Sequence, residues 1–155
     1  MSAVTLTTPA DQPTMTINRV FNAPAALVWS AWTEPQHIER WWGDGAKVVV
    51  HDLRPGGAWR YEMLWPNGQS AAFKGVYLEV EPPRRLVNTF GIEGMYEITE
   101  SHSFDDLGDG RTRYTCVTTF ASIAVRDVMV KRATANTEAG LKRLEELLQT
   151  LEAAA

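Results

Sequence analysis

The sequence contains little of several features that mark common classes of protein. It has one cysteine, Cys116, so no intramolecular disulfide can form, and a reducing compartment is expected. No apolar run approaches the roughly 18 residues that a membrane-spanning helix needs, so no membrane partner is expected. Residues 1–13 lack the basic and apolar parts of a signal peptide. These absences favour a cytoplasmic protein.

Positive charge and metal ligands are also scarce. With 15 Lys and Arg against 19 Asp and Glu, the net charge is −4, and no basic cluster is longer than Arg84-Arg85, which argues against a nucleic-acid partner. The 3 histidines and the single cysteine are scattered along the chain, so no metal site is expected. The sequence contains no P-loop, dinucleotide-binding or nucleophile-elbow motif, and we expect no cofactor.

The remaining composition is that of an ordinary soluble domain. A chain of 155 residues that is 45% hydrophobic is long enough to bury a substantial core. Residues 1–13, with Ser, Thr, Pro and Asp among small residues, are predicted to form a disordered leader. We expect residues 14–152 to fold as a single domain, because no internal repeat or second domain is evident.

The longest periodic segment, residues 123–151, predicts an α-helix around which the rest of the chain is organised. Apolar and small residues recur every three or four positions, and no proline interrupts them. Ser122 is the expected N-cap. The inward stripe comprises Val125, Met129, Ala133, Asn136, Gly140, Leu144, Leu147 and Leu151, and the opposite face comprises Asp127, Lys131, Glu138, Lys142, Arg143, Glu145 and Glu146.

The segments before this helix predict an antiparallel sheet. Residues 15–21 alternate as a strand, and short helices are expected over residues 25–32 and 34–40. Six strands follow at hairpin spacing, over residues 47–53, 59–65, 71–80, 86–92, 96–104 and 112–121. They must form an antiparallel meander, because parallel strands need long crossovers. The expected fold class is therefore α+β, with a curved sheet in the order β-α-α-β6-α wrapped around one long C-terminal helix.

The strand faces predict which side chains point toward the helix. In residues 96–104, one face is polar throughout, which directs Glu100 and His102 inward. A few polar groups converging in an apolar enclosure are typical of a small-molecule pocket. We therefore expect a ligand site lined by Trp59, Tyr61, Met63, Asn88, Phe90, Tyr96, Ile98, Glu100, His102, Tyr114, Thr118, Met129, Ala133, Asn136, Thr137 and Gly140.

Two alternatives remain for the interior of this site. The middle of the long helix carries small or polar residues, which leave room against the sheet. Either large aromatic side chains fill that room or it is a cavity. Trp29, Trp32, Trp41 and Trp42 lie close together in the sequence, and we expect this group to pack as a structural plug or lid.

Several strings carry a resemblance that covers nearly the whole folded chain. They are Phe21-Asn22-Ala23-Pro24, Val28-Trp29-Ser30-Ala31-Trp32-Thr33, Trp41-Trp42-Gly43, Asp52-Leu53-Arg54-Pro55-Gly56-Gly57 with Trp59, Phe73-Lys74-Gly75-Val76, and Glu79-Val80-Glu81-Pro82-Pro83-Arg84-Arg85-Leu86-Val87. From about Thr14 to Leu151 the chain resembles the activator of heat-shock protein 90 ATPase homologue family, within the START/Bet v 1-like (SRPBCC) superfamily. The resemblance implies the helix-grip fold. It also implies a deep, mostly apolar cavity that superfamily members use for lipids, polyketides and other hydrophobic molecules, and in some cases for chemistry.

The chain departs from the family pattern at two points. Many members have Gly-Trp in the last helix, where this chain has Gly140-Leu141, which removes bulk from the cavity side. The eukaryotic chaperone activators carry a separate N-terminal activating domain, for which these residues leave no room. The first departure favours a cavity, and the second argues against a chaperone partner.

Three functions are therefore ranked. The first is binding of a small hydrophobic molecule between the C-terminal helix and the sheet. The second is an enzyme of the cyclase, dehydratase or isomerase kind, with Glu100 and His102 as acid/base groups. The alternative to this enzymatic role is a structural one, in which Glu100 and His102 are a buried polar pair whose hydrogen bonds are satisfied by neighbouring groups. The third is a co-chaperone that stimulates a heat-shock ATPase. A homodimer remains open.

Overall fold

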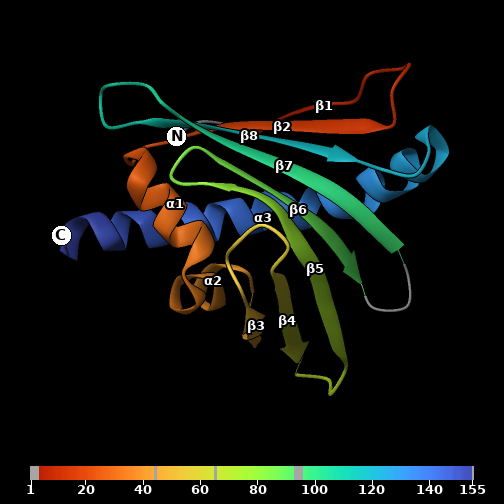
Figure 1. The fold of residues 1–155 in the computed structure, drawn as a ribbon, viewed down its shortest axis with the longest axis horizontal. Coiled ribbons are helices and arrows are strands. Elements are labelled where there is room, and N and C mark those ends of the chain that lie inside the picture. The colour runs from red at the N-terminus through yellow and green to blue at the C-terminus, as the bar shows by residue number, and fades with distance from the viewer. Residues whose placement is uncertain (1–3, 44, 65, 93–95, 155) are drawn as a thin grey trace.

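The computed structural model describes residues 4–43, 45–64, 66–92 and 96–154 (Figure 1). For residues 96, 132–136 and 154 it describes the backbone but not the side chain. The elements are β1 (Thr5–Thr7), β2 (Thr14–Phe21), α1 (Ala25–Thr33), α2 (Pro35–Trp41), β3 (Ala46–His51), β4 (Ala58–Leu64), β5 (Ser70–Glu81), β6 (Arg85–Ile92), β7 (Tyr96–Asp106), β8 (Thr112–Thr119) and α3 (Ile123–Ala154).

The described strands form one antiparallel sheet in the order β1-β2-β8-β7-β6-β5-β4-β3. After β2 the chain passes through α1 and α2 to the far edge of the sheet, and then returns strand by strand. The return ends when β8 pairs with β2, with Met15 opposite Thr118. The predicted meander of six strands, here β3 to β8, is confirmed, and so is the α+β class.

Strand β1 is an exception to the predicted disorder of residues 1–13. Thr5, Leu6 and Thr7 pair with β2, and Leu6 is opposite Ile17. Three residues without a clear alternation are too short to be recognised as a strand from the sequence. The sheet therefore begins one strand earlier than expected.

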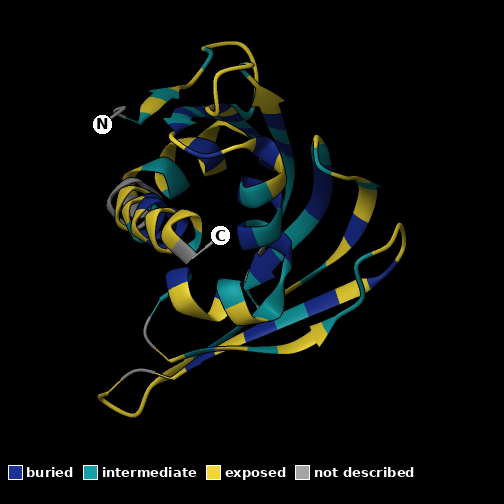
Figure 2. Cartoon of the chain, turned by 90° about the vertical axis from the view of Figure 1, so that its left-hand side faces the viewer, coloured by how far each residue is buried: buried dark blue, intermediate teal, exposed yellow. Residues whose placement is uncertain are grey.

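The sheet curves around α3, while α2 packs beside β3 and α1 packs against α2, α3 and β7 (Figures 1 and 2). Helix α3 begins as predicted, because the Val125 N–H donates to Ser122 Oγ at 3.1 Å. The buried side chains of its C-terminal half include Leu141, Leu144, Leu147 and Leu148. No helix in the described ranges is long and apolar enough to span a membrane.

The first turns of α3 differ from the predicted stripe. Val125 is 38% exposed, and the neighbouring Arg126 is buried instead. The guanidinium of Arg126 donates hydrogen bonds to the backbone carbonyls of Pro9, Gln12 and Thr14. These bonds satisfy a buried charge and hold the segment before β2 against the helix. The prediction that Val125 faces inward is therefore wrong.

Two residues predicted on the exposed face of α3 are also turned toward the protein. Glu145 is buried, and Arg143 is half-buried. Arg143 donates from Nε to the Trp41 carbonyl at 2.8 Å and from Nη2 to the Trp42 carbonyl at 3.2 Å. A cation on these last carbonyls stabilises the C-terminal end of α2. Arg143 thus fastens α2 to α3.

Candidate functional site

A cluster of polar side chains crosses the inner face of β6, β7 and β8. The strand register sets Asn88 opposite Glu100, and Glu100 opposite Thr118. One step further along β7, His102 lies opposite Cys116. Because alternate residues of a strand share a face, all of these side chains point toward the helices. Glu100 and His102 lie on this inner face together with Asn88, and each forms a hydrogen bond with the Asn88 side chain.

Both ring nitrogens of His102 have partners. Nδ1 is 2.7 Å from the hydroxyl of Tyr114, and Nε2 is 3.1 Å from Oδ1 of Asn88. Oδ1 of Asn88 can only accept, so Nε2 of His102 carries a proton. The amide group of Asn88 donates to Oε1 of Glu100 at 3.2 Å and to the Thr89 carbonyl at 3.0 Å. The ring of His102 is therefore fixed in position from both sides.

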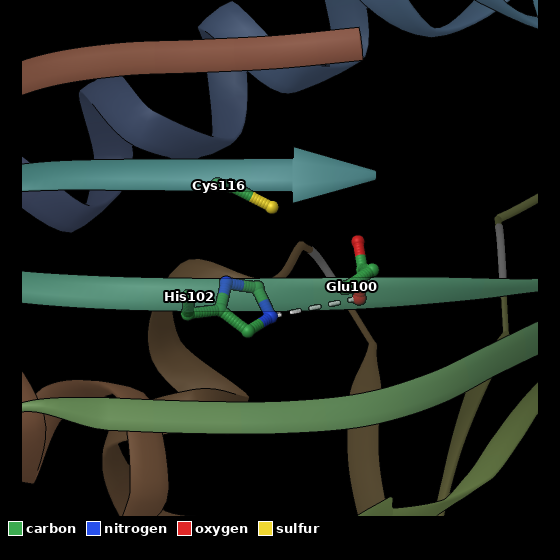
Figure 3. Close-up of side chains that lie close together, drawn as sticks. All are labelled: Glu100, His102 and Cys116. Atoms are coloured by element: carbon green, nitrogen blue, oxygen red, sulfur yellow. Dashed lines mark ion pairs between the residues drawn. The ribbon is translucent and has the colours of Figure 1, made fainter. Parts of the chain in front are cut away.

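Glu100 is the member of the cluster nearest to solvent. Its side chain is 23% exposed, whereas that of His102 is 5% exposed. Oε1 accepts from Asn88 and lies 3.7 Å from His102 Nε2, while no described residue forms a hydrogen bond to Oε2. Figure 3 shows the two carboxylate oxygens pointing in different directions, one of them toward His102. With respect to the described residues, Oε2 is therefore the available oxygen of Glu100.

The cluster holds charge despite its burial. Burial is the largest influence on His102 and lowers its pKa, but the Cys116 sulfur and the Glu100 carboxylate together raise the pKa to about 10. His102 is therefore an imidazolium at neutral pH and forms an ion pair with Glu100. Burial also raises the pKa of Tyr114 well above its usual value, so the hydroxyl beside His102 stays protonated.

A closed aromatic cluster, made of Trp29, Trp32, Trp41, Phe104 and Tyr114, lies on one side of these polar groups. The ring of Trp32 lies 4.5 Å from Tyr114, 4.7 Å from Trp41 and 5.4 Å from His102, measured between centroids. Trp41 donates from Nε1 to the Ala31 carbonyl at 2.9 Å, which satisfies its one polar atom. Trp29, Trp41, Phe104 and Tyr114 are buried, and Trp32 is half-buried.

An open aromatic cluster, made of Trp42, Trp59, Tyr61, Phe73 and Phe90, lies on the other side. Trp42 packs edge-on against Tyr61 and Phe73, each at 5.1 Å between ring centroids. Trp42, Phe73 and Phe90 are only half-buried. The register places Phe90 opposite Ile98, one inward step along β7 from Glu100. Half-buried apolar surface therefore adjoins the available carboxylate oxygen.

Close approach of the backbone shapes this open cluster. The indole N–H of Trp59 donates to the Thr89 carbonyl at 3.1 Å, across strand β5. A Cβ at Gly75 would lie 2.0 Å from that same carbonyl oxygen and 2.7 Å from the indole nitrogen. Only glycine leaves room for this hydrogen bond, which fixes the ring of Trp59 flat in the sheet face.

Few described atoms surround Gly140 of α3, and the side chains of residues 132–136 are not among them. Gly140 is buried, yet a Cβ built there would meet only Nη2 of Arg143, at 3.8 Å, among the described atoms. A Cβ at Gly43 would meet the same Nη2 at 3.8 Å and the terminal carbon of Met63 at 2.8 Å. Gly140, Arg143 and Met63 are thus close neighbours. Buried space without partner atoms is where a ligand gains contacts.

A second hydrogen-bonded group connects the open cluster with a partly exposed histidine. The Tyr61 and Tyr77 hydroxyls interact, and the Tyr77 hydroxyl lies 3.3 Å from Nδ1 of His51. Burial raises the pKa of Tyr61 well above its usual value and raises that of Tyr77 to about 12. Burial lowers the pKa of His51. These groups are therefore neutral at pH 7.

The predicted lining residues divide into three groups. Trp59, Tyr61, Met63, Asn88, His102, Tyr114, Thr118 and Gly140 are buried, and Phe90, Ile98, Glu100, Met129 and Thr137 are half-buried. The side chains of Tyr96, Ala133 and Asn136 lie outside the described residues. Sequence reasoning missed the contacts of Trp32 and Trp42 with this face, and the pairing of Cys116 with His102, because each depends on packing or register between distant segments.

A separate pocket of about 400 Å³ opens at the surface near the start of α1. It is lined by Ala25, Pro83, Arg84, Phe104, Asp105 and Asp106. Its charged rim carries one cation and two carboxylates, and none of its lining residues belongs to the hydrogen-bonded cluster. We therefore assign the candidate site to the inner face of β6, β7 and β8.

Comparison with known proteins places this arrangement in a family. Protein Ms6760 from Mycobacterium smegmatis has a similar structure, with a TM-score of 0.83, 28% identity, and coverage of 94% of this chain and 97% of that one. A Rhodobacter sphaeroides protein has a TM-score of 0.85 at 21% identity, covering 96% of this chain and 99% of that one. CalU16 from Micromonospora echinospora has a TM-score of 0.67 at 28% identity, covering 96% of this chain and 74% of that one. No curated protein matches the chain.

The fold shared with these structures is the Bet v 1-like (SRPBCC) fold, which is compatible with small-molecule binding and with chaperone-like roles. The family model for "Activator of Hsp90 ATPase homolog 1-like protein" matches residues 22–149. This match spans α1, α2, the whole meander and most of α3. The chain therefore belongs to the family of Activator of Hsp90 ATPase homolog 1-like proteins.

Proposed function

We propose that the protein binds a small, mostly apolar molecule that donates a hydrogen bond to Glu100. The observation that carries this proposal is the state of the Glu100 carboxylate. Oε1 is committed to Asn88 and His102, while Oε2 has no partner among the described residues. A half-buried acceptor without a partner is unfavourable until a donor reaches it.

The surroundings indicate the apolar character of the ligand. Phe90 and Ile98 are half-buried next to Glu100, and Trp42 and Phe73 are half-buried beyond them. At about 25 cal/mol per Å² of apolar surface removed from water, contacts with such rings supply most of the binding free energy. The space at Gly140 supports the same function from the helix side.

The charge of the cluster indicates a neutral polar group on the ligand. Because His102 is protonated, Glu100 and His102 form a pair with no net charge. An organic cation, which cannot displace the proton of His102 as a metal ion can, would therefore have to leave water without gaining an unpaired anion. A hydroxyl or amide N–H loses much less on desolvation. We expect phenols, alcohols or amides to bind better than amines.

Native mass spectrometry of the freshly purified protein, compared with its denatured mass, is the first test. An additional mass released on denaturation would identify the ligand class. Fluorescence titration with a panel of phenols, sterols and fatty acids then measures affinity. Glu100→Gln should weaken binding of a donor ligand about tenfold, which corresponds to one hydrogen bond.

Glu97→Gln is the matched control, because Glu97 lies on the same strand but is exposed. It should bind like the wild type. A clean apo mass together with no binding across the panel would contradict the proposal. That result would favour the chaperone role named in the family description. Measuring whether the protein stimulates a heat-shock ATPase would then test that role.

A second candidate, an enzyme with Glu100 and His102 as acid/base groups, is favoured by the same available oxygen. Oε2 could take a proton from a bound molecule while the imidazolium of His102 returns one. The double variant Glu100→Gln, His102→Asn separates the two functions. In either case the affinity falls by about what one hydrogen bond contributes, but only an enzyme also has a turnover that the double variant loses.

A further inference from the structure

We propose that Glu100, His102 and Cys116 form a binding site for a thiophilic divalent cation such as Zn²⁺. One oxygen, one nitrogen and one sulfur of these residues all lie within 4.8 Å of one another (Figure 3). The three residues come from paired strands, since His102 lies directly opposite Cys116 and Glu100 is two residues before His102. A rigid sheet therefore holds the three donor atoms together.

The geometry is close to that of a tetrahedral site. With bonds of about 2.0–2.3 Å to N, O and S, neighbouring ligand atoms lie roughly 3.4–3.6 Å apart. Nε2 of His102 and Oε1 of Glu100 are already 3.7 Å apart. The sulfur needs to approach by at most about 1.4 Å, a distance that side-chain rotation of Cys116 and Glu100 can cover.

The surroundings of His102 suit a metal-bound imidazole. A ligating histidine usually donates its second N–H to a neighbouring acceptor, which fixes the ring. Here Nδ1 lies 2.7 Å from the Tyr114 hydroxyl, so Nε2 is the nitrogen that would bind the cation. Its present partner, Oδ1 of Asn88, would give up the hydrogen bond. The Asn88 amide would remain on Glu100.

The charges also balance. A carboxylate, a thiolate and a neutral imidazole carry two negative charges, which one divalent cation neutralises in this buried place. Binding releases the proton of Nε2 and the proton of the Cys116 thiol. The sulfur of Cys116 lies 3.7 Å from Thr118 Oγ1, a weak hydrogen bond that the sulfur can give up when it binds a cation.

Three protein ligands leave a fourth position open. Open sites of this kind occur where zinc binds water or a substrate, whereas structural zinc sites are filled by four protein ligands. The partial exposure of Glu100 gives the entry route, because His102 and Cys116 lie behind it. This inference does not depend on the proposed organic ligand, since it requires only the three donor atoms.

Titration of the reduced wild-type protein with Co²⁺, followed by absorption spectroscopy, tests the site. We expect one equivalent to bind, with a thiolate-to-cobalt charge-transfer band and the visible spectrum of a four-coordinate ion, and Zn²⁺ should displace it. Cys116→Ser should abolish the charge-transfer band. Glu100→Gln and His102→Asn should each weaken binding at least tenfold, and Tyr114→Phe by about 10–100-fold.

Glu97→Gln and His51→Asn are the matched controls, and both should bind Co²⁺ as the wild type does. Absence of a thiolate charge-transfer band in the wild type at millimolar Co²⁺ would overturn the proposal, whether or not the variants fold. Retention of full affinity in Cys116→Ser would also overturn it. Cys116→Ser should leave affinity for the phenol panel intact, so failure of the metal site and failure of the organic site are distinguishable.

Discussion

The closed and open aromatic clusters are built from the same residue types but differ in how completely they are packed. In the closed cluster, Trp32 makes ring contacts with Trp41, Tyr114, Phe104 and His102, and Phe104 is 1% exposed. In the open cluster, Trp59 and Tyr61 are buried, but Trp42, Phe73 and Phe90 are half-buried. The closed cluster has one half-buried ring, Trp32, so more ring surface stays exposed in the open cluster. The polar group of Asn88, Glu100 and His102 lies at the boundary between them.

Replacing one phenylalanine in each cluster should give the largest difference. Phe104→Ala should destabilise the protein by about 3–5 kcal/mol, because it removes a fully enclosed ring. Phe90→Ala should cost about 1–3 kcal/mol, since its ring is half-buried. Chemical denaturation of both variants measures the free energy of unfolding. Equal losses would show that the two clusters are packed alike.

The charge at the boundary should make stability depend on pH. The pKa of His102 is raised from its ordinary value of 6.5 to about 10 in the fold. A raised pKa means that the folded state holds the proton more tightly, so this contribution is complete below about pH 6.5 and is lost as the pH rises toward 10. The unfolding free energy of the wild type should fall over this interval relative to His102→Asn. A constant difference between the two proteins would show that His102 is neutral when folded.

Breaking the attachment of α2 to α3 should have an effect of intermediate size on stability. Arg143→Met removes two hydrogen bonds to the Trp41 and Trp42 carbonyls but keeps the apolar stem, and should destabilise the protein by about 1–3 kcal/mol. It should also loosen Trp42 and alter the affinity of the open cluster for apolar ligands. Lys142→Met is the control, because Lys142 is exposed, and should change stability by no more than about 0.5 kcal/mol.

The smallest expected effect concerns Gly140. Gly140→Ala should stabilise the protein by about 0.5–1 kcal/mol, because alanine favours a helix and its Cβ meets only Arg143 Nη2 at 3.8 Å. The same methyl group should reduce ligand affinity, because it occupies space beside the open cluster. Thermal unfolding with and without ligand measures both effects. A destabilised variant would indicate that no free space exists at this position.

The alternation and turn residues of the sequence were sufficient to predict the sheet, its meander and the inward direction of Glu100 and His102. They were not sufficient for contacts that depend on three-dimensional packing. Arg126 is buried where Val125 was expected, because backbone carbonyls of a segment more than a hundred residues away accept from its guanidinium. Only the register of β7 with β8 reveals the place of Cys116 beside His102.

The pairing of β2 with β8 has a consequence for the way in which the protein is made. Met15 leaves the ribosome early, but its partner Thr118 follows 103 residues later (118 − 15). At roughly 5–20 residues per second, β2 waits about 5–20 s for the strand beside it, and longer for α3. Throughout that interval α1 and α2 are already made, but α3, around which the sheet curves, is still absent. The nascent chain therefore depends on its last quarter to bury its first strands, and a ribosome pause before residue 112 would prolong the stage at which it is most prone to aggregate.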